Sequence, residues 1–550
     1  GMRDSGTDDD AVVRGRARRQ RAVGIASTRG SVPTAPYPAG ARSGERDRVP
    51  YDGSGAGGTA DVVRSSPCTA VDDERGVRRQ AMVEESDMIR RWFRVATMFL
   101  GAVLAAPVLA EDYDVLIRNG RLLDGTGAPW RHADVAIVGD RIVEVGPIPA
   151  TATAELVIDA TGRYVTPGFI DPHSHAVNGL MTEELAHAKP VLLQGVTTVF
   201  VNPDGGGPGD LGPQLAAIAE QVPGVNVAPM IGHNGVRTMV MGLDDRRPTP
   251  EELEEMRRLV RRGMEVAFGF SSGPFYVPGK YSDTTELVAL AEVAAEFPGA
   301  FHISHIRDES NYDIGVIAAV QELIEVSRQT GLPGIVTHFK NLGPFVWGAS
   351  KELVTIIDAA REEGLSIWAD QYAYAVSGSG LQPALVPGWA QEGGAEAIAR
   401  RLQDPEQRGL IREEMVRNLE RRAGAGAILI RRHAADPGLE GRFLDDIARE
   451  RSQDPLDTAI DMLIDGGAAI LSFNMNDEDV ERIMRQPWTM TSSDGGLVRF
   501  GDGNEHPRAY GAYPRKIRKY VMEEGVVTLE HMVHASSGLP ASVLGVEDRG

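Results

Sequence analysis

The segment Gly168-Phe169-Ile170-Asp171-Pro172-His173-Ser174-His175 ends a short apolar run that begins at residue 164. Alternate side chains of a strand point to the same side, so His173 and His175 can face one point together. Two imidazoles that converge there can hold a divalent metal, since neutral histidine is a common zinc ligand. The alternative is a chance pair of polar loop residues, but later strands supply further ligands in a consistent order. The segment therefore predicts a metal site at the end of a strand.

Strands and helices alternate along the chain after this segment. Apolar strands are expected at residues 197–201, 225–231, 265–270, 300–304, 334–337, 365–369 and 488–492. Helices lie between them, and one begins at Thr249-Pro250-Glu251-Glu252, which combines an N-cap, a proline at the first helical position and an acid three residues on. With the strand that carries His173, the pattern gives eight strands with helical crossovers. This is the pattern of a (β/α)₈ barrel of the α/β class.

The remaining segments are arranged around this barrel, which we place at residues 166–530. Short Val- and Ile-rich segments separated by turn residues predict a small antiparallel, β-sandwich-like domain at residues 111–165, to which the C-terminus could also contribute. Residues 377–486 are too long for one crossover and predict a mostly helical insertion. Residues 531–550 form a C-terminal segment.

The N-terminal part has a different composition. Residues 1–87 are rich in Arg, Gly, Ser and Asp without a sustained apolar period, and we expect them to be disordered and not part of the native protein. Residues 88–110 have a basic start, an apolar centre and a small-residue exit, which predicts a secretory signal peptide. A membrane anchor is the alternative, but the apolar run is short and Arg94 interrupts it. The mature protein would then begin near Glu111, in the periplasm or outside the cell.

Composition excludes several classes of protein. The 550 residues are 42% hydrophobic, as in a globular protein with a large core. A net charge of −21 argues against a nucleic-acid-binding surface and favours a soluble protein. The only cysteine is Cys68, so intrachain disulfides are excluded and a thiolate near the His pair is not expected.

The predicted strand ends carry the candidate chemistry, because function in such a barrel lies at the C-terminal ends of the strands. Metal-binding or acidic side chains end the first, fifth, sixth and eighth strands, and these are His173, His175, His305, His338 and Asp494. Converging on one mouth, they make a metal signature. A zinc ion lowers the pKa of a bound water to about 7, and Asp494 beside it could take the proton during attack on an amide.

The chain resembles the amidohydrolase superfamily and, within it, the N-acyl-D-amino-acid deacylases (D-aminoacylases). The resemblance runs from about residue 113 to the C-terminus. It rests on the His173 segment and on Gly232-His233-Asn234, Tyr276-Val277-Pro278-Gly279, Ser304-His305-Ile306-Arg307-Asp308-Glu309, His338-Phe339-Lys340, Asp370-Gln371-Tyr372-Ala373-Tyr374, Ser493-Asp494-Gly495 and His506-Pro507-Arg508.

The resemblance implies a zinc enzyme with one or two metal ions and a small N-acyl amino acid as its substrate. The implied metal ligands are His173, His175, His305 and His338, with Asp494 as the catalytic carboxylate. Lys340, Tyr372 and Arg508 are implied to hold the substrate's α-carboxylate. His233 ends the third strand, and we favour a role near the substrate over a role in the core. No nucleic acid and no stable membrane anchoring after signal cleavage are expected.

Two features depart from the deacylase pattern. Deacylases carry a metal-binding cysteine after the second strand, where Asp204 stands here. Relatives also continue past the position of Gly550 into strands of the small β domain, which leaves open whether that domain is complete. The fourth strand ends in Ser271-Ser272-Gly273, with no carboxylate or lysine to bridge two metals.

We therefore expect Asp204 to complete the metal site with His305 and His338. A carboxylate is a harder ligand than a thiolate, so manganese or cobalt should be better tolerated. The rival reading makes Asp204 a turn residue in Pro203-Asp204-Gly205-Gly206.

Three functions remain open from the sequence. The first is a secreted metal-dependent deacylase of N-acyl-D-amino acids. The second is another amidohydrolase, such as a cyclic-amide hydrolase or a dipeptidase, because one fold serves many substrates. The third is a non-catalytic binding protein with a degenerate site. The four histidines with Asp494 argue against the third, and the cationic pair Lys340 and Arg508 favours the first over the second.

Overall fold

The computed structural model of the chain describes residues 112–501, 503–546 and 548–549. The disordered segment predicted at residues 1–87 and the signal peptide predicted at residues 88–110 lie outside this part and stay predictions. Within the described residues, none of the helices has the length and hydropathy needed to cross a membrane.

A nine-stranded parallel sheet forms the centre of the molecule, in the order β16-β12-β11-β10-β9-β8-β7-β6-β17. Its strands are β6 (Phe169–His175), β7 (Val196–Val201), β8 (Asn226–Gly232), β9 (Gly269–Ser272), β10 (His302–Ser304), β11 (Gly334–Val336), β12 (Ile367–Gln371), β16 (Thr489–Thr491) and β17 (Gly495–Gly496). Because β16 pairs with β12 and β17 pairs with β6, residues 489–496 join the two ends of the sheet. The predicted barrel is confirmed.

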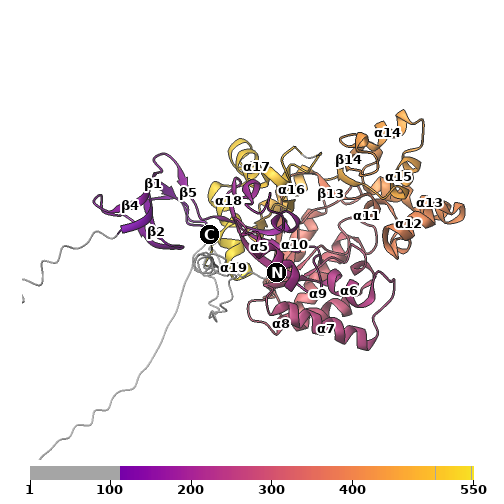
Figure 1. Cartoon of the computed structure of the whole chain (residues 1–550), viewed down its shortest axis with the longest axis horizontal. Coiled ribbons are helices and arrows are strands. Elements are labelled where there is room, and N and C mark those ends of the chain that lie inside the picture. Colours follow the sequence, from indigo (N-terminus) through magenta and orange to yellow (C-terminus); the bar gives the residue numbers. More distant parts are fainter. Residues whose placement is uncertain (1–111, 502, 547, 550) are drawn as a thin grey trace, which may run out of the picture.

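The crossover helices pack around this sheet (Figure 1). They include α5 (Gly212–Glu220), α6 (His233–Met241), α7 (Pro250–Met264), α8 (Thr284–Ala295), α9 (Gly315–Thr330), α10 (Ser350–Glu362) and α16 (Asp477–Met484). The predicted start of α7 is confirmed as a capping box, in which Thr249 and Glu252 bond each other's backbone N–H. The following strand was predicted too early. The backbone N–H groups of Val266 and Ala267 still donate to Gly263, so β9 begins only at Gly269.

A small five-stranded sheet precedes the barrel. It consists of β1 (Asp112–Leu122), β2 (Arg131–Val138), β3 (Arg141–Gly146), β4 (Thr153–Asp159) and β5 (Tyr164–Val165). The predicted purely antiparallel pairing is wrong, because β4 and β5 both run parallel to β1. The connection before β4 crosses back beside Arg118, whose guanidinium donates to the carbonyls of Ile148, Pro149 and Ala152.

The long insertion stands to one side of the barrel (Figure 1). It is mostly helical, as predicted, with α11 (Leu381–Leu385), α12 (Gly394–Gln403), α13 (Pro405–Arg421), α14 (Leu444–Glu450) and α15 (Pro455–Ile464). The prediction missed an antiparallel sheet of β13 (Ser377–Gly380), β15 (Ala469–Ser472) and β14 (Ile428–Arg432). The predicted range of the insertion, residues 377–486, also extended too far, because it includes α16, which packs on α10 of the barrel.

Four C-terminal helices of the described residues cover the strands where the barrel closes. They are α17 (Arg508–Arg515), the π-helix η5 (Lys516–Glu523), α18 (Leu529–Ser536) and α19 (Gly538–Leu544). The buried hydroxyl of Tyr513 lies 3.2 Å from the carbonyl oxygen of Ile170 on β6 and 3.1 Å from that of Thr491 on β16. Leu539 and Leu544 pack in one apolar cluster with Ile170 and Met490. The helices therefore hold the first and last barrel strands together.

Candidate active site

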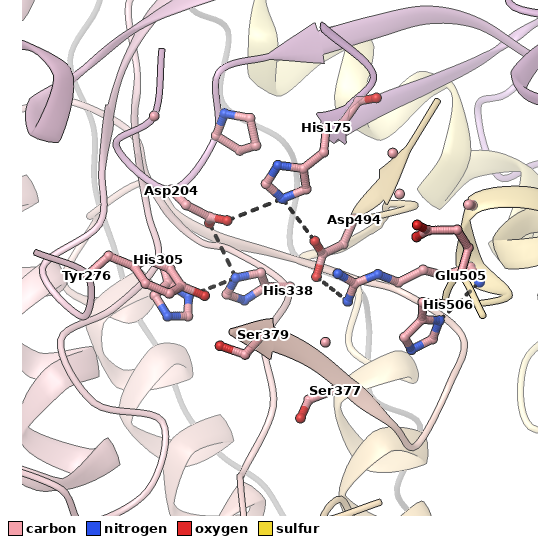
Figure 2. Close-up of a pocket in the computed structure, with 18 of the residues that line it drawn as sticks. His175, Asp204, Tyr276, His305, His338, Ser377, Ser379, Asp494, Glu505 and His506 are labelled. Carbon is pink, nitrogen blue, oxygen red and sulfur yellow. Dashed lines mark hydrogen bonds and ion pairs between the residues drawn. The ribbon is translucent and has the colours of Figure 1, made fainter. Parts of the chain in front are cut away.

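The four predicted histidine ligands meet at the barrel mouth in two pairs. Figure 2 shows three of them, His175, His305 and His338, around Asp204. The Nε2 atoms of His173 and His175 lie 3.3 Å apart at the end of β6. The His305 Nδ1 atom lies 2.8 Å from the His338 Nε2 atom, on loops that follow β10 and β11. Their convergence follows from the parallel sheet, whose strands all end at this face.

Asp204 lies between the two histidine pairs. Its Oδ2 atom is 3.3 Å from His175 Nε2 and 3.5 Å from His173 Nε2, and its Oδ1 atom is 3.3 Å from His338 Nε2. The loop after β7 holds it there with a left-handed backbone, φ 57°. A Cβ atom on Gly273, after β9, would lie 2.0 Å from the Asp204 carbonyl oxygen, so only glycine fits against this loop. Asp204 is therefore in a turn, as the alternative interpretation predicted, and its carboxylate also faces the histidines.

This arrangement fits a divalent metal. Three groups of side chains each bring their donor atoms within 4.8 Å of one another. These groups are His173, His175 and Asp204; His173, His338 and Asp494; and Asp204, His305 and His338. The buried Oδ1 atom of Asp204 and Nε2 atom of His305 have no hydrogen-bond partner among the described residues. Buried polar atoms of this kind need a partner, and imidazole nitrogen with carboxylate oxygen is a zinc ligand set.

Asp494 joins this cluster from the segment between β16 and β17. Its Oδ1 atom lies 3.1 Å from His175 Nε2, and its Oδ2 atom lies 2.6 Å from the Arg508 Nη1 atom. Burial disfavours the charged carboxylate, but the Arg508 guanidinium beside it outweighs that cost. The pKa of Asp494 therefore lies well below its usual value, and the group is ionised at neutral pH.

Lys340 and Arg508 both line the cavity, as expected of carboxylate-binding residues. The Lys340 Nζ atom, however, already donates to Glu309 Oε1 at 2.6 Å and lies 2.7 Å from His338 Nδ1. Lys340 therefore positions His338 and has its charge compensated. Tyr372 is placed behind the cavity wall, where its ring packs against the Arg508 guanidinium with 4.8 Å between their centres. Tyr372 does not line the cavity itself, and its predicted role in holding the α-carboxylate stays a prediction.

The structure also corrects the interpretation of His233. The side chain is fully buried and does not line the cavity. Its Nε2 atom lies 2.8 Å from Glu286 Oε1, and Glu286 also accepts a hydrogen bond from Arg237. His233 follows β8 directly but opens α6, and this turns its ring toward α8 and away from the mouth. It belongs to a buried polar network.

Sequence reasoning missed two carboxylates that orient the ligands. Asp171 accepts backbone hydrogen bonds from His173 and Ser493, which links β6 to the segment of Asp494. Asp370 accepts the backbone N–H of His338 at 2.9 Å. Burial raises the pKa of Asp171 to about 6. Both residues lie within the motifs that carry the family resemblance. Their position on a strand that bears metal ligands, or at the end of the neighbouring strand, could have indicated this role.

The cavity over the cluster has a volume of about 520 Å³. Its walls come from the barrel strand ends, from β13 of the insertion and from the loop after β17. Four cationic side chains line it, and they are Lys340, Arg422, Arg431 and Arg508. Four carboxylates also line it, and they are Asp204, Glu309, Asp494 and Glu505. The space therefore suits a small polar molecule.

Comparison with known proteins shows close relatives of the chain. Residues 156–550 match the profile described as the amidohydrolase family. N-acyl-D-glutamate deacylase of Alcaligenes xylosoxydans xylosoxydans is 33% identical over 465 residues, covering 80% of this chain and 85% of the relative. D-aminoacylase of the same organism is 30% identical over 472 residues, covering 80% and 86%.

Solved structures agree with these matches. The N-acyl-D-glutamate deacylase of Bordetella bronchiseptica, complexed with zinc and a phosphonate that mimics the tetrahedral intermediate, has a TM-score of 0.67 and 32% identity. The match covers 80% of this chain and 87% of that one. A D-aminoacylase with a binuclear metal centre has a TM-score of 0.66 and 29% identity, with the same coverage.

Proposed function

Because this chain belongs to the amidohydrolase family, we propose that it hydrolyses the amide bond of N-acyl-D-amino acids, releasing a carboxylic acid and a free D-amino acid. The relatives that are 30–33% identical over 80% of the chain are deacylases of such compounds. The observation that carries the proposal is the cluster of four histidines with Asp204 and Asp494, which opens into a cavity lined by Arg508.

The residues that would hold the metal are the two histidine pairs, with Asp204 between them and Asp494 at one side. Zinc is the first candidate, because imidazole and carboxylate ligands suit it and the solved N-acyl-D-glutamate deacylase is complexed with zinc. When bound, zinc supplies Lewis acidity, which activates water and polarises an amide carbonyl.

Asp494 supplies the acid–base chemistry in this proposal. Its carboxylate is ionised and accepts a proton from the attacking water, then returns it to the leaving amide nitrogen. Arg508 contacts Asp494 and lines the cavity, so an α-carboxylate bound to its guanidinium places the neighbouring amide nitrogen near that carboxylate.

Hydrolysis of matched N-acetyl-D- and N-acetyl-L-amino acids, with and without added zinc, tests the proposal. We expect zinc-dependent release of the D-amino acids, and a chelator should abolish it. Hydrolysis of cyclic amides with no turnover of N-acetyl-D-amino acids would instead support another amidohydrolase.

Asp204 gives a separate prediction about metal binding. Asp204→Ala should bind metal at least about tenfold more weakly or lose one equivalent, because the carboxylate whose two oxygens face the two histidine pairs is removed. Metal content after dialysis against a graded chelator measures this directly. Asp204→Cys is the matched control, which restores a ligand and should shift preference from manganese and cobalt toward zinc. Unchanged stoichiometry and affinity in Asp204→Ala would leave it as a turn residue only.

A further inference from the structure

Arg422 differs from the other cations that line the cavity. Lys340 is paired with Glu309, Arg431 with Glu505 and Arg508 with Asp494. No carboxylate of the described residues lies within ion-pair distance of Arg422, although the residue is only 1% exposed. Its Nε atom donates to the Tyr312 hydroxyl at 2.7 Å, and its buried Nη1 atom has no hydrogen-bond partner in the described part of the chain.

A buried arginine without a carboxylate partner is energetically unfavourable. Guanidinium keeps its proton in proteins, so Arg422 cannot become neutral as a buried lysine can. A buried charge without a partner is costly, and buried cations are therefore normally paired. Because Arg422 also lines the cavity, a bound ligand is the partner that would satisfy it.

The position of Arg422 indicates which part of a ligand it meets. Its partner Tyr312 packs on Phe275, and Phe275 packs on His305, with ring centroids 5.8 and 5.1 Å apart. Arg508 contacts Asp494 instead. In Figure 2, Tyr276 and His305 lie on one side of the cluster, and Glu505 and His506 lie on the other, beyond Asp494. Arg422 is thus on the His305 side, and Arg508 is on the Asp494 side.

The proposed substrate has two ends, which can be matched to the His305 side and the Asp494 side of the cavity. In an N-acyl amino acid the α-carboxylate and the side chain both branch from the nitrogen side of the scissile bond. The acyl chain extends from the carbonyl side. With the α-carboxylate at Arg508 and the carbonyl at the cluster, the group that extends toward Arg422 belongs to the acyl chain.

We propose that Arg422 binds a carboxylate at the far end of the acyl group. The preferred substrates would then be D-amino acids acylated by a dicarboxylic acid, such as N-succinyl-D-amino acids. This inference rests on the proposed function and names a substrate class for the same site. A planar guanidinium suits a terminal carboxylate, which it can bind through two hydrogen bonds.

The test compares N-succinyl-D-leucine with N-succinamoyl-D-leucine, in which an amide of the same shape replaces the terminal carboxylate. The wild-type kcat/KM should favour the acid about 10- to 100-fold, as expected for a hydrogen bond to a charged group. Arg422→Met should bring this ratio close to one. Arg417→Met, which removes an exposed positive charge of α13 that does not line the cavity, should keep the wild-type ratio.

Melting temperatures establish that each variant is folded. If Arg422→Met does not fold, Tyr312→Phe removes the hydroxyl that orients the guanidinium and should reduce the ratio. A wild-type ratio near one, or a ratio that survives Arg422→Met, overturns the inference while the deacylase function stands. So does an Arg422-dependent preference for N-acetyl-D-glutamate over N-acetyl-D-glutamine, which would assign Arg422 to the side chain. Absence of hydrolysis of every N-acyl-D-amino acid would contradict the proposed function itself.

Discussion

Replacing Asp494 by asparagine is expected to lower kcat at least about a hundredfold while the protein still folds and binds metal. The amide has nearly the same shape and keeps an oxygen toward His175, but it cannot accept the proton of the attacking water. It also cannot return that proton to the leaving nitrogen. Steady-state kinetics on an N-acetyl-D-amino acid, with metal content measured on the same sample, gives the result.

The control for this variant must separate lost chemistry from lost positioning. Asp494 also pairs with Arg508, so the KM of Asp494→Asn should change much less than its kcat if proton transfer is the main loss. Near-wild-type turnover in a metal-loaded variant would remove Asp494 from the acid–base role.

Replacing the α-carboxylate of the substrate by a carboxamide should cost about 2–5 kcal/mol in transition-state binding. This corresponds to a loss of about 30- to 5,000-fold in kcat/KM. We assign most of this effect to Arg508, because its guanidinium has five N–H donors and only its Nη1 atom is paired with Asp494. The Nζ atom of Lys340, in contrast, already has three contacts within 3.0 Å, to Glu309 Oε1, His338 Nδ1 and the His338 carbonyl. Arg508→Lys should therefore lose much of the discrimination between acid and amide, since a point charge cannot replace a bidentate fork.

Lys340→Met provides the contrast. It removes a cation from the same cavity but should act mainly through the orientation of His338, lowering kcat for the acid and the amide alike. Equal wild-type activity on the acid and the amide would contradict carboxylate recognition and favour a cyclic-amide hydrolase.

The barrel could be predicted because its signals are local. Apolar strands, capped helices and glycine stops repeat along the chain, and parallel strands must end at one face. That geometry alone brought His173, His175, His305 and His338 together. The strand β13 could not be found this way, because Ser377-Gly378-Ser379-Gly380 has no apolar side chain and is a strand only through pairing with β15.

The misplaced side chains depend on contacts between segments far apart in sequence. His233 follows a barrel strand, as the ligands do, yet its ring turns to Glu286, 53 residues further on. Lys340 has the charge expected of a carboxylate-binding residue, but Glu309 reaches it from the preceding strand's loop. Neither partner is signalled by periodicity or spacing, so the final directions of these side chains could not be predicted from sequence.

The segment of residues 489–496, which joins the two ends of the sheet, has a consequence for biogenesis. During synthesis on the ribosome, the four histidines and Asp204 are all made long before the carboxylate proposed as the general base. A growing chain can therefore collect metal ligands while it still lacks the group that transfers protons. We expect activity to begin only when residues 489–496 complete the ring and bring Asp494 to the histidines. A local opening of this segment would then stop hydrolysis even where the rest of the barrel stays folded.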